Sequence, residues 1–113
     1  MSGQLAEDQA CQFLQMRGLQ LITRNFRCRR GEIDIIMNDG GTVVFVEVRQ
    51  RQADALVGAA ASVSSAKQQR LIAAARFWIA RHPTHAAAFM RFDLVAIDGD
   101  ALDWQQDVLH VDG

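Results

Sequence analysis

The sequence predicts a single α/β domain over 1–113 with an αβββαβ core, in which helices flank a mixed β-sheet. Two observations carry this prediction. The stretch 31–51 alternates apolar and polar residues on both sides of Gly40-Gly41, which is typical of two strands joined by a tight turn. A helical pattern then separates the strands 42–49 and 91–97, so these two should lie parallel, joined by a right-handed crossover.

The composition is that of an ordinary globular chain, and its charge indicates which kinds of partner the protein can bind. The formal net charge is −1, which argues against tight nonspecific binding to polyanions by the whole surface. The charge is uneven, however, because 17–30 holds five arginines and no acid, while 98–113 holds five aspartates and no Lys or Arg. A local basic face beside an acidic site is compatible with this distribution.

Neither a membrane span nor a secretion signal is expected. No apolar run approaches the roughly 18–20 residues that cross a bilayer, and the first residues lack a basic and apolar leader pattern. Cys11 and Cys28 match no metal-binding spacing and read as free thiols of a reducing compartment. We therefore expect a cytoplasmic protein without a membrane partner or a small-molecule cofactor.

The segment before the hairpin predicts one helix and one strand. An amphipathic helix is expected over 4–17, with Gly18 as its stop. Its apolar stripe comprises Ala6, Ala10, Phe13 and Leu14, widened by Leu5 and Met16. Glu7 lies at the border of this stripe, where a solvated acid favourable to the helix dipole is an equal alternative. Residues 19–28 then read as a strand, and 27–30 as its exposed end and turn.

The hairpin pattern predicts which side chains share a face. One apolar layer would consist of Ile33, Ile35, Met37, Val44, Val46 and Val48, and the opposite faces would carry Glu32, Asp34, Ile36, Val43, Phe45, Glu47 and Arg49. A two-residue loop at Gly40-Gly41 puts Asp34 directly opposite Glu47, and a four-residue loop over 38–41 makes them diagonal neighbours. In both registers the two carboxylates project from the same face.

The rest of the chain predicts a connection, a helix and two strands. Residues 52–62 have no clean period and read as a mobile connection or a helical extension. Ser65-Ala66-Lys67-Gln68 is a capping-box pattern that starts a helix, and His82-Pro83 ends it. The buried stripe of that helix would be Leu71, Ala74, Ala75 and Trp78, and a last edge strand would include Leu102, Trp104, Val108, Leu109 and Val111.

Asp34 and Glu47 on adjacent strands, with a third carboxylate nearby, are the residue types that bind a hard cation. Mg²⁺ or Mn²⁺ takes one or two carboxylates, water and substrate phosphate oxygens. Such a metal activates water for attack on a phosphodiester. Arg49 projects from the same face as Glu47 and can contact the phosphate, and the Val48 carbonyl can complete the metal shell. The alternative is an ion network on a solvent-facing sheet. The histidines His82, His85 and His110 have no ligand-like spacing.

Five segments carry a resemblance to a known family. They are Glu7 in its helix, Gly31-Glu32-Ile33-Asp34-Ile35-Ile36, Val44-Phe45-Val46-Glu47-Val48-Arg49-Gln50-Arg51, Lys67-Gln68-Gln69-Arg70-Leu71 and Arg91-Phe92-Asp93-Leu94-Val95-Ala96-Ile97. From Gly3 to about Val111 the chain resembles the YraN-like family of small bacterial proteins. That family is similar to archaeal Holliday-junction resolvases and has the restriction-endonuclease-like fold, with a PD-(D/E)-x-K site.

The resemblance implies a metal-dependent nuclease-like protein that hydrolyses phosphodiesters in DNA, including branched DNA, and that forms a homodimer. Its metal ligands would be Glu7, Asp34 and Glu47, and its nucleic-acid contacts Arg27, Arg29, Arg30, Arg51 and Lys67. Arg49 stands where the family's site has lysine, and arginine cannot be deprotonated. Ile33 stands where proline precedes the aspartate. The alternative is a catalytically inactive adaptor that keeps the fold and binds nucleic acid or a protein.

Overall fold

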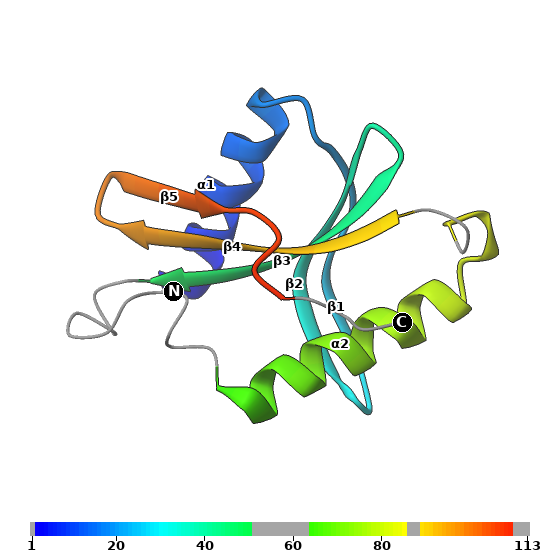
Figure 1. Cartoon of the computed structure of the whole chain (residues 1–113). Coiled ribbons are helices and arrows are strands. Elements are labelled where there is room, and N and C mark those ends of the chain that lie inside the picture. The colour runs from blue at the N-terminus through cyan, green and yellow to red at the C-terminus, as the bar shows by residue number, and fades with distance from the viewer. Residues whose placement is uncertain (1, 51–63, 86–88, 110–113) are drawn as a thin grey trace.

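A computed structural model describes residues 2–50, 64–85 and 89–109, and in this part the chain forms a mixed sheet between two helices (Figure 1). The elements are α1 (Ser2–Met16), β1 (Gln20–Cys28), β2 (Gly31–Asp39), β3 (Thr42–Gln50), α2 (Ser65–Ala80), the 3₁₀ turn η3 (Pro83–His85), β4 (Phe89–Asp98) and β5 (Ala101–Gln105). The strand order is β1-β2-β3-β4-β5. Only β3 and β4 are parallel, as the crossover predicts. None of the described helices is long and apolar enough to span a bilayer.

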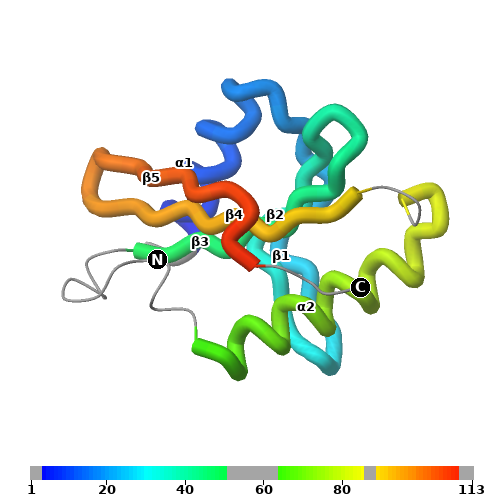
Figure 2. Tube along the Cα trace, viewed as in Figure 1, coloured from blue at the N-terminus to red at the C-terminus, as the bar shows by residue number. Residues whose placement is uncertain are grey.

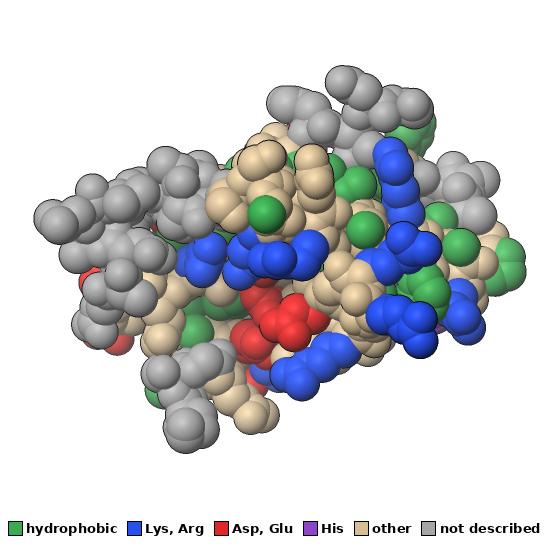
Figure 3. Space-filling view, turned by 90° about the horizontal axis from the view of Figure 1, so that it is seen from below, with side chains coloured by type: hydrophobic (Ala, Val, Ile, Leu, Met, Phe, Trp, Pro, Cys, Tyr) green, Lys and Arg blue, Asp and Glu red, His purple; other side chains and the backbone are tan. Residues whose placement is uncertain are grey.

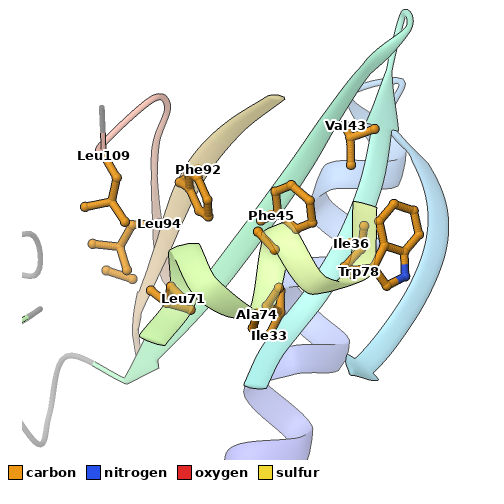
Figure 4. Packing of buried hydrophobic residues seen from close by; sticks show 12 residues of the cluster. Ile33, Ile36, Val43, Phe45, Leu71, Ala74, Trp78, Phe92, Leu94 and Leu109 are labelled. Carbon is orange, nitrogen blue, oxygen red and sulfur yellow. The ribbon is translucent and has the colours of Figure 1, made fainter. Parts of the chain in front are cut away.

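The two helices cover opposite faces of the sheet, as the trace in Figure 2 also shows. The predicted stripe of α2 is confirmed, because its four buried residues are Leu71, Ala74, Ala75 and Trp78. Trp78 packs edge-on against Phe45, with ring centroids 6.1 Å apart, and Phe45 stacks on Phe92 at 5.3 Å (Figure 4). These aromatic contacts fix α2 across the middle of the sheet.

The other helix, α1, packs closely through small side chains. Ala6, Ala10 and Leu14 are buried against the sheet, and Gly18, at φ 98°, ends the helix region as predicted. The widening of the stripe by Leu5 and Met16 is wrong, since these side chains are 62% and 84% exposed. The buried face of α1 is therefore narrow, with Cys11 beside the line of Ala6, Ala10 and Leu14.

The β2–β3 register is the one that a two-residue turn produces. Asp39 pairs with Thr42, and the ladder continues to Ile35 opposite Val46. Gly40 and Gly41 both have positive φ, 57° and 98°, which is the requirement of the turn that matches strand twist. The four-residue alternative over 38–41 is therefore excluded.

One feature of the hairpin prediction is wrong. Ile33 packs on the α2 face with Ile36, whereas Ile35 and Met37 pack on the α1 face. The alternation therefore breaks at Asp34. The residue of β1 that lies between the partners of Ile33 and Ile35 is Asn25, whose φ is 56°. Asn25 thus adopts a left-handed conformation at the point of β1 beside which β2 changes face.

Two element boundaries also differ from the prediction. The cap of α2 is Ser64, whose side chain accepts from the Lys67 amide at 3.2 Å, so the helix begins one residue earlier than a Ser65 cap implies. The last strand stops at Gln105, because Asp107 adopts φ 57° and turns the chain. Val108 and Leu109 then pack against the α2 face. Predictions for 52–62, Arg51, His110 and Val111 lie outside the described residues.

Candidate metal and nucleic-acid site

A cleft of about 570 Å³ opens between the β1–β2 turn and the start of α2. Basic side chains from both elements border it: Arg27, Arg29 and Arg30 from the turn region, and Lys67 and Arg70 from α2. We call these five residues the basic rim. Figure 3 views this side of the molecule and shows acidic side chains gathered between basic ones. The predicted nucleic-acid contacts that the structure describes thus share one cleft.

Asp34 and Glu47, the acidic pair, line the same cleft. The Asp34 carboxylate takes the place of a ladder partner, because its Oδ2 accepts from the Val48 amide at 2.8 Å. Glu47 follows the buried part of β3 and is only 8% exposed. The break of alternation at Asp34 therefore brings a fixed carboxylate beside a buried one.

The electrostatics of Glu47 are unusual. Burial, together with the charge of Asp34, raises the pKa of Glu47 from 4.5 to about 7, and Lys67 acts in the opposite direction. A carboxyl group with this pKa is unfavourable in its charged form in the absence of a further cation. Strongly shifted groups in clefts are enriched at functional sites.

Two cations contact Glu47 from different elements. The Nζ of Lys67 lies 2.6 Å from Oε2 of Glu47, whereas Nε of Arg49 lies 3.8 Å from the same oxygen. Lys67 comes from the first turn of α2, which Ser64 caps. The capped helix start thus sets the position of the ammonium group above β3.

Glu7 reaches the edge of the site from the opposite side of the sheet. It lies near enough to Asp34 for that charge, after burial, to raise the pKa of Glu7. Its carboxylate also lies 3.6 Å from Arg24, which pairs with Asp8 at 2.8 Å. Within the described ranges, no three His, Cys, Asp or Glu side chains converge closely enough to hold a metal. The structure therefore brings together Asp34 and Glu47 and leaves Glu7 beside them.

Asp34, Glu47 and Arg49 do not lie on a solvent-facing sheet, as the alternative interpretation expected, although Arg49 does pair with Glu47, with 3.8 Å between Nε and Oε2. Helix α2 covers that face, and Ile36, Val43 and Phe45 are fully or almost fully buried beneath it. Glu32 forms a surface pair with Arg27 at 3.6 Å, and both side chains are largely exposed. Asp34, Glu47 and Arg49 thus lie at the edge of a buried apolar layer, where they line the cleft and can contact a ligand.

Arg70 was not among the predicted site residues, although a signal for it exists. It follows Lys67 by three positions, and residues at this spacing share one face of a helix. The same turn of α2 approaches β2 closely, because an added Cβ at Gly31 would lie 2.8 Å from the Arg70 carbonyl oxygen. Glycine at position 31 is therefore what allows the two walls of the cleft to meet.

Gly31→Ala is expected to lower the free energy of unfolding by about 1–3 kcal/mol, because backbone rather than a flexible side chain meets the new methyl group. Urea unfolding followed by far-UV circular dichroism measures this change. Glu32→Ala, at the exposed neighbouring position, is the control and should stay within about 0.5 kcal/mol of the native chain. Equal stability of Gly31→Ala and the native chain would contradict the close approach.

Comparison with known proteins places the chain in a family. The model of the uncharacterised protein family UPF0102 matches residues 6–97. A UPF0102 protein of Ralstonia nicotianae is 52% identical, with 98% of this chain and 88% of the relative covered. Relatives of the same name from Halorhodospira halophila and Aeromonas hydrophila are 54% and 50% identical, covering 93% and 92% of this chain and 84% and 81% of their own lengths. The chain therefore belongs to the UPF0102 family, the YraN-like family that its motifs indicated.

Proposed function

We propose that this protein is a metal-dependent, nuclease-like protein that acts on DNA. The observation that carries the proposal is the acidic pair at the base of a cleft with a basic rim. Such a rim attracts and orients a phosphate backbone. The acidic pair provides hard oxygen donors at the point where the DNA backbone would lie. The acidic pair therefore suits a metal ion, and the basic rim suits the phosphate groups of the DNA that would bind beside it.

The acidic pair fits Mg²⁺ or Mn²⁺ without a third carboxylate, because these ions retain waters and share substrate phosphate oxygens. Asp34 is held by the Val48 amide, and the pKa of about 7 leaves Glu47 ready to exchange its proton for a cation. When bound, the metal would lower the pKa of a coordinated water and neutralise charge on the phosphate. Glu7, beside Asp34, would assist the acidic pair in holding the metal.

The reaction supported is hydrolysis of a phosphodiester. The oxygen of a water molecule forms a bond to phosphorus while the bond from phosphorus to one sugar oxygen breaks. The water releases a proton to solvent, and the departing oxygen takes up a proton from solvent. The basic rim would hold the backbone, and Arg49 would neutralise charge on the phosphate. By analogy with resolvases of this fold, the active form would be a homodimer.

A second candidate is an adaptor that binds DNA through the basic rim and does not cut it. The close pairing of Lys67 with Glu47 favours this candidate, because the ammonium group already neutralises the carboxylate that a metal needs. The two candidates differ in one property. A nuclease requires a divalent cation at the acidic pair, and the adaptor does not.

Asp34→Asn separates the two candidates with little risk to the fold, since an amide oxygen can still accept from the Val48 amide. Millimolar Mn²⁺ should raise the melting temperature of the native chain by a few degrees and leave that of Asp34→Asn unchanged. The native chain should also cut duplex, single-stranded or branched DNA, and the variant should not. DNA binding without a metal response or cleavage would instead establish the adaptor.

A further inference from the structure

Lys67 occupies a position that helix energetics alone disfavour. It lies in the first turn of α2, where the exposed amides carry partial positive charge and acidic side chains are preferred. The described first turn of α2 contains no acid to balance it. The favourable partner of Lys67 is Glu47, on another element, at 2.6 Å. A residue that departs from the local preference in this way, and contacts a buried acid, points to a role in the site.

The geometry distinguishes Lys67 from Arg49. Arg49 lies two residues after Glu47, at the position expected for lysine, but its Nε is 3.8 Å from the carboxylate oxygen that Lys67 contacts at 2.6 Å. Lys67 also keeps 33% of its side chain exposed at the cleft. Its ammonium group, a compact charge on a flexible stem with three donors, can stay near Glu47 and still turn toward a ligand.

The remaining cations of the cleft are placed for the DNA backbone rather than for the reacting phosphate. Arg27 is 76% exposed in its side chain and pairs with Glu32, and Arg29, Arg30 and Arg70 are exposed. Of the cations that line the cleft, only Lys67 and Arg49 pair with Glu47 in the described part of the chain.

We propose that helix α2 supplies the missing lysine: Lys67 is the cation of the reacting centre, and Arg49 has a secondary role. This inference rests on the proposed function. Without ligands, Lys67 is the counter-ion of Glu47. In a complex with metal and DNA, Glu47 would hold the metal, and the N–H groups of Lys67 would donate to the attacking water and to a non-bridging phosphate oxygen. Water still attacks phosphorus as the bond to the sugar oxygen breaks, and the protons still exchange with solvent.

The test compares Lys67→Met with Arg49→Met and with Arg70→Met, a matched control one helical turn away on the same cleft. Without DNA, Lys67→Met should bind Mn²⁺ about three- to tenfold more tightly, because a cation that competes for Glu47 is removed. Arg70→Met should leave Mn²⁺ affinity unchanged. Isothermal titration calorimetry measures this directly and does not depend on cleavage.

With DNA and Mn²⁺, Lys67→Met should lower the cleavage rate by about 100-fold or more, the size of effect seen on removing one charge-stabilising donor. Lys67→Arg should not restore cleavage, because a planar guanidinium does not reproduce the ammonium geometry. DNA affinity in EDTA should fall no more for Lys67→Met than for Arg70→Met.

Two results would overturn this inference alone: cleavage and Mn²⁺ affinity of Lys67→Met that equal those of Arg70→Met, or a tenfold gain of cleavage in Arg49→Lys. A native chain that neither binds Mn²⁺ nor cuts DNA overturns the proposed function, and the inference fails with it. The native chain alone reveals that second case, so the two failures are distinguishable.

Discussion

Glu47→Gln is expected to abolish metal-dependent cleavage and, in the same molecule, to make the metal-free protein more stable above neutral pH. The activity loss follows from removing a ligand of the acidic pair, and we expect at least a 100-fold fall in rate. The stability gain follows from the cost of a charged Glu47, which is 8% exposed and lies beside Asp34. Glutamine keeps the shape and carries no charge.

The raised pKa of Glu47 determines whether its contribution to stability rises or falls with pH. The pKa of Glu47 is about 7 in the folded chain against a usual 4.5, so between these pH values the folded state binds more protons than the unfolded state. The contribution of Glu47 to the free energy of unfolding therefore falls as pH rises from 4.5 to 7, by on the order of 2–3 kcal/mol in total. Glu47→Gln should lack this fall.

Urea unfolding of the native chain and Glu47→Gln in EDTA, at pH 5 and at pH 8, measures the effect. The two proteins should be similar at pH 5, and Glu47→Gln should be the more stable at pH 8. Glu32→Gln is the matched control, because Glu32 is exposed on the same hairpin. A stability difference between the native chain and Glu47→Gln that is the same at both pH values would contradict the assignment.

Much of the fold follows from local sequence patterns. The turn at Gly40-Gly41 determines the β2–β3 register, and the stripe from Leu71 to Trp78 determines the buried face of α2. These features depend on residues close in sequence, where turn chemistry and periodicity act directly. The same register places Asp34 and Glu47 on neighbouring strands just beyond the ladder, which ends at Ile35 opposite Val46, and this is why the site could be located before its surroundings were known.

The surroundings of the pair could not be predicted, because they depend on how distant segments meet. The contact between Lys67 and Glu47 depends on where α2 crosses the sheet, and that crossing depends on the close approach at Gly31. The displacement of Ile33 to the α2 face depends on one left-handed residue, Asn25, in the neighbouring strand. Neither the Lys67–Glu47 contact nor the displacement of Ile33 is indicated by a periodic pattern in the sequence. The resemblance indicates position 49 for the lysine, and the structure places the ammonium group of Lys67, from α2, 2.6 Å from Glu47.

Asp93 was part of a recognised motif but had no predicted role. The structure shows that it is a buried anchor, 1% exposed, at the centre of β4. Its carboxylate accepts from Trp104 Nε1 at 2.9 Å and from the Asp107 amide at 3.0 Å, and it pairs with Arg91 at 3.0 Å. These contacts fasten β5 and the turn after it to the sheet. A buried charge with several partners is expected to be costly to disrupt.

Asp93→Ala should lower the free energy of unfolding by about 3–5 kcal/mol, because it removes the buried acceptor of Trp104 and, within the described ranges, leaves Arg91 with Asp39 alone, at 3.0 Å. Asp93→Asn, which keeps an acceptor oxygen but loses the charge, should lower stability less, and Asp98→Ala, exposed at the end of the same strand, should change stability little.

A double variant tests the Arg91–Asp93 pair. Adding Arg91→Ala to Asp93→Ala should lower stability by less than the sum of the two single changes, since neither partner then remains charged and buried. Chemical unfolding of the three single variants at Asp93 and Asp98, of Arg91→Ala and of the double variant measures these differences. Strict additivity would show that the Arg91 pair contributes nothing, and the anchor would then rest on Trp104 and the turn alone.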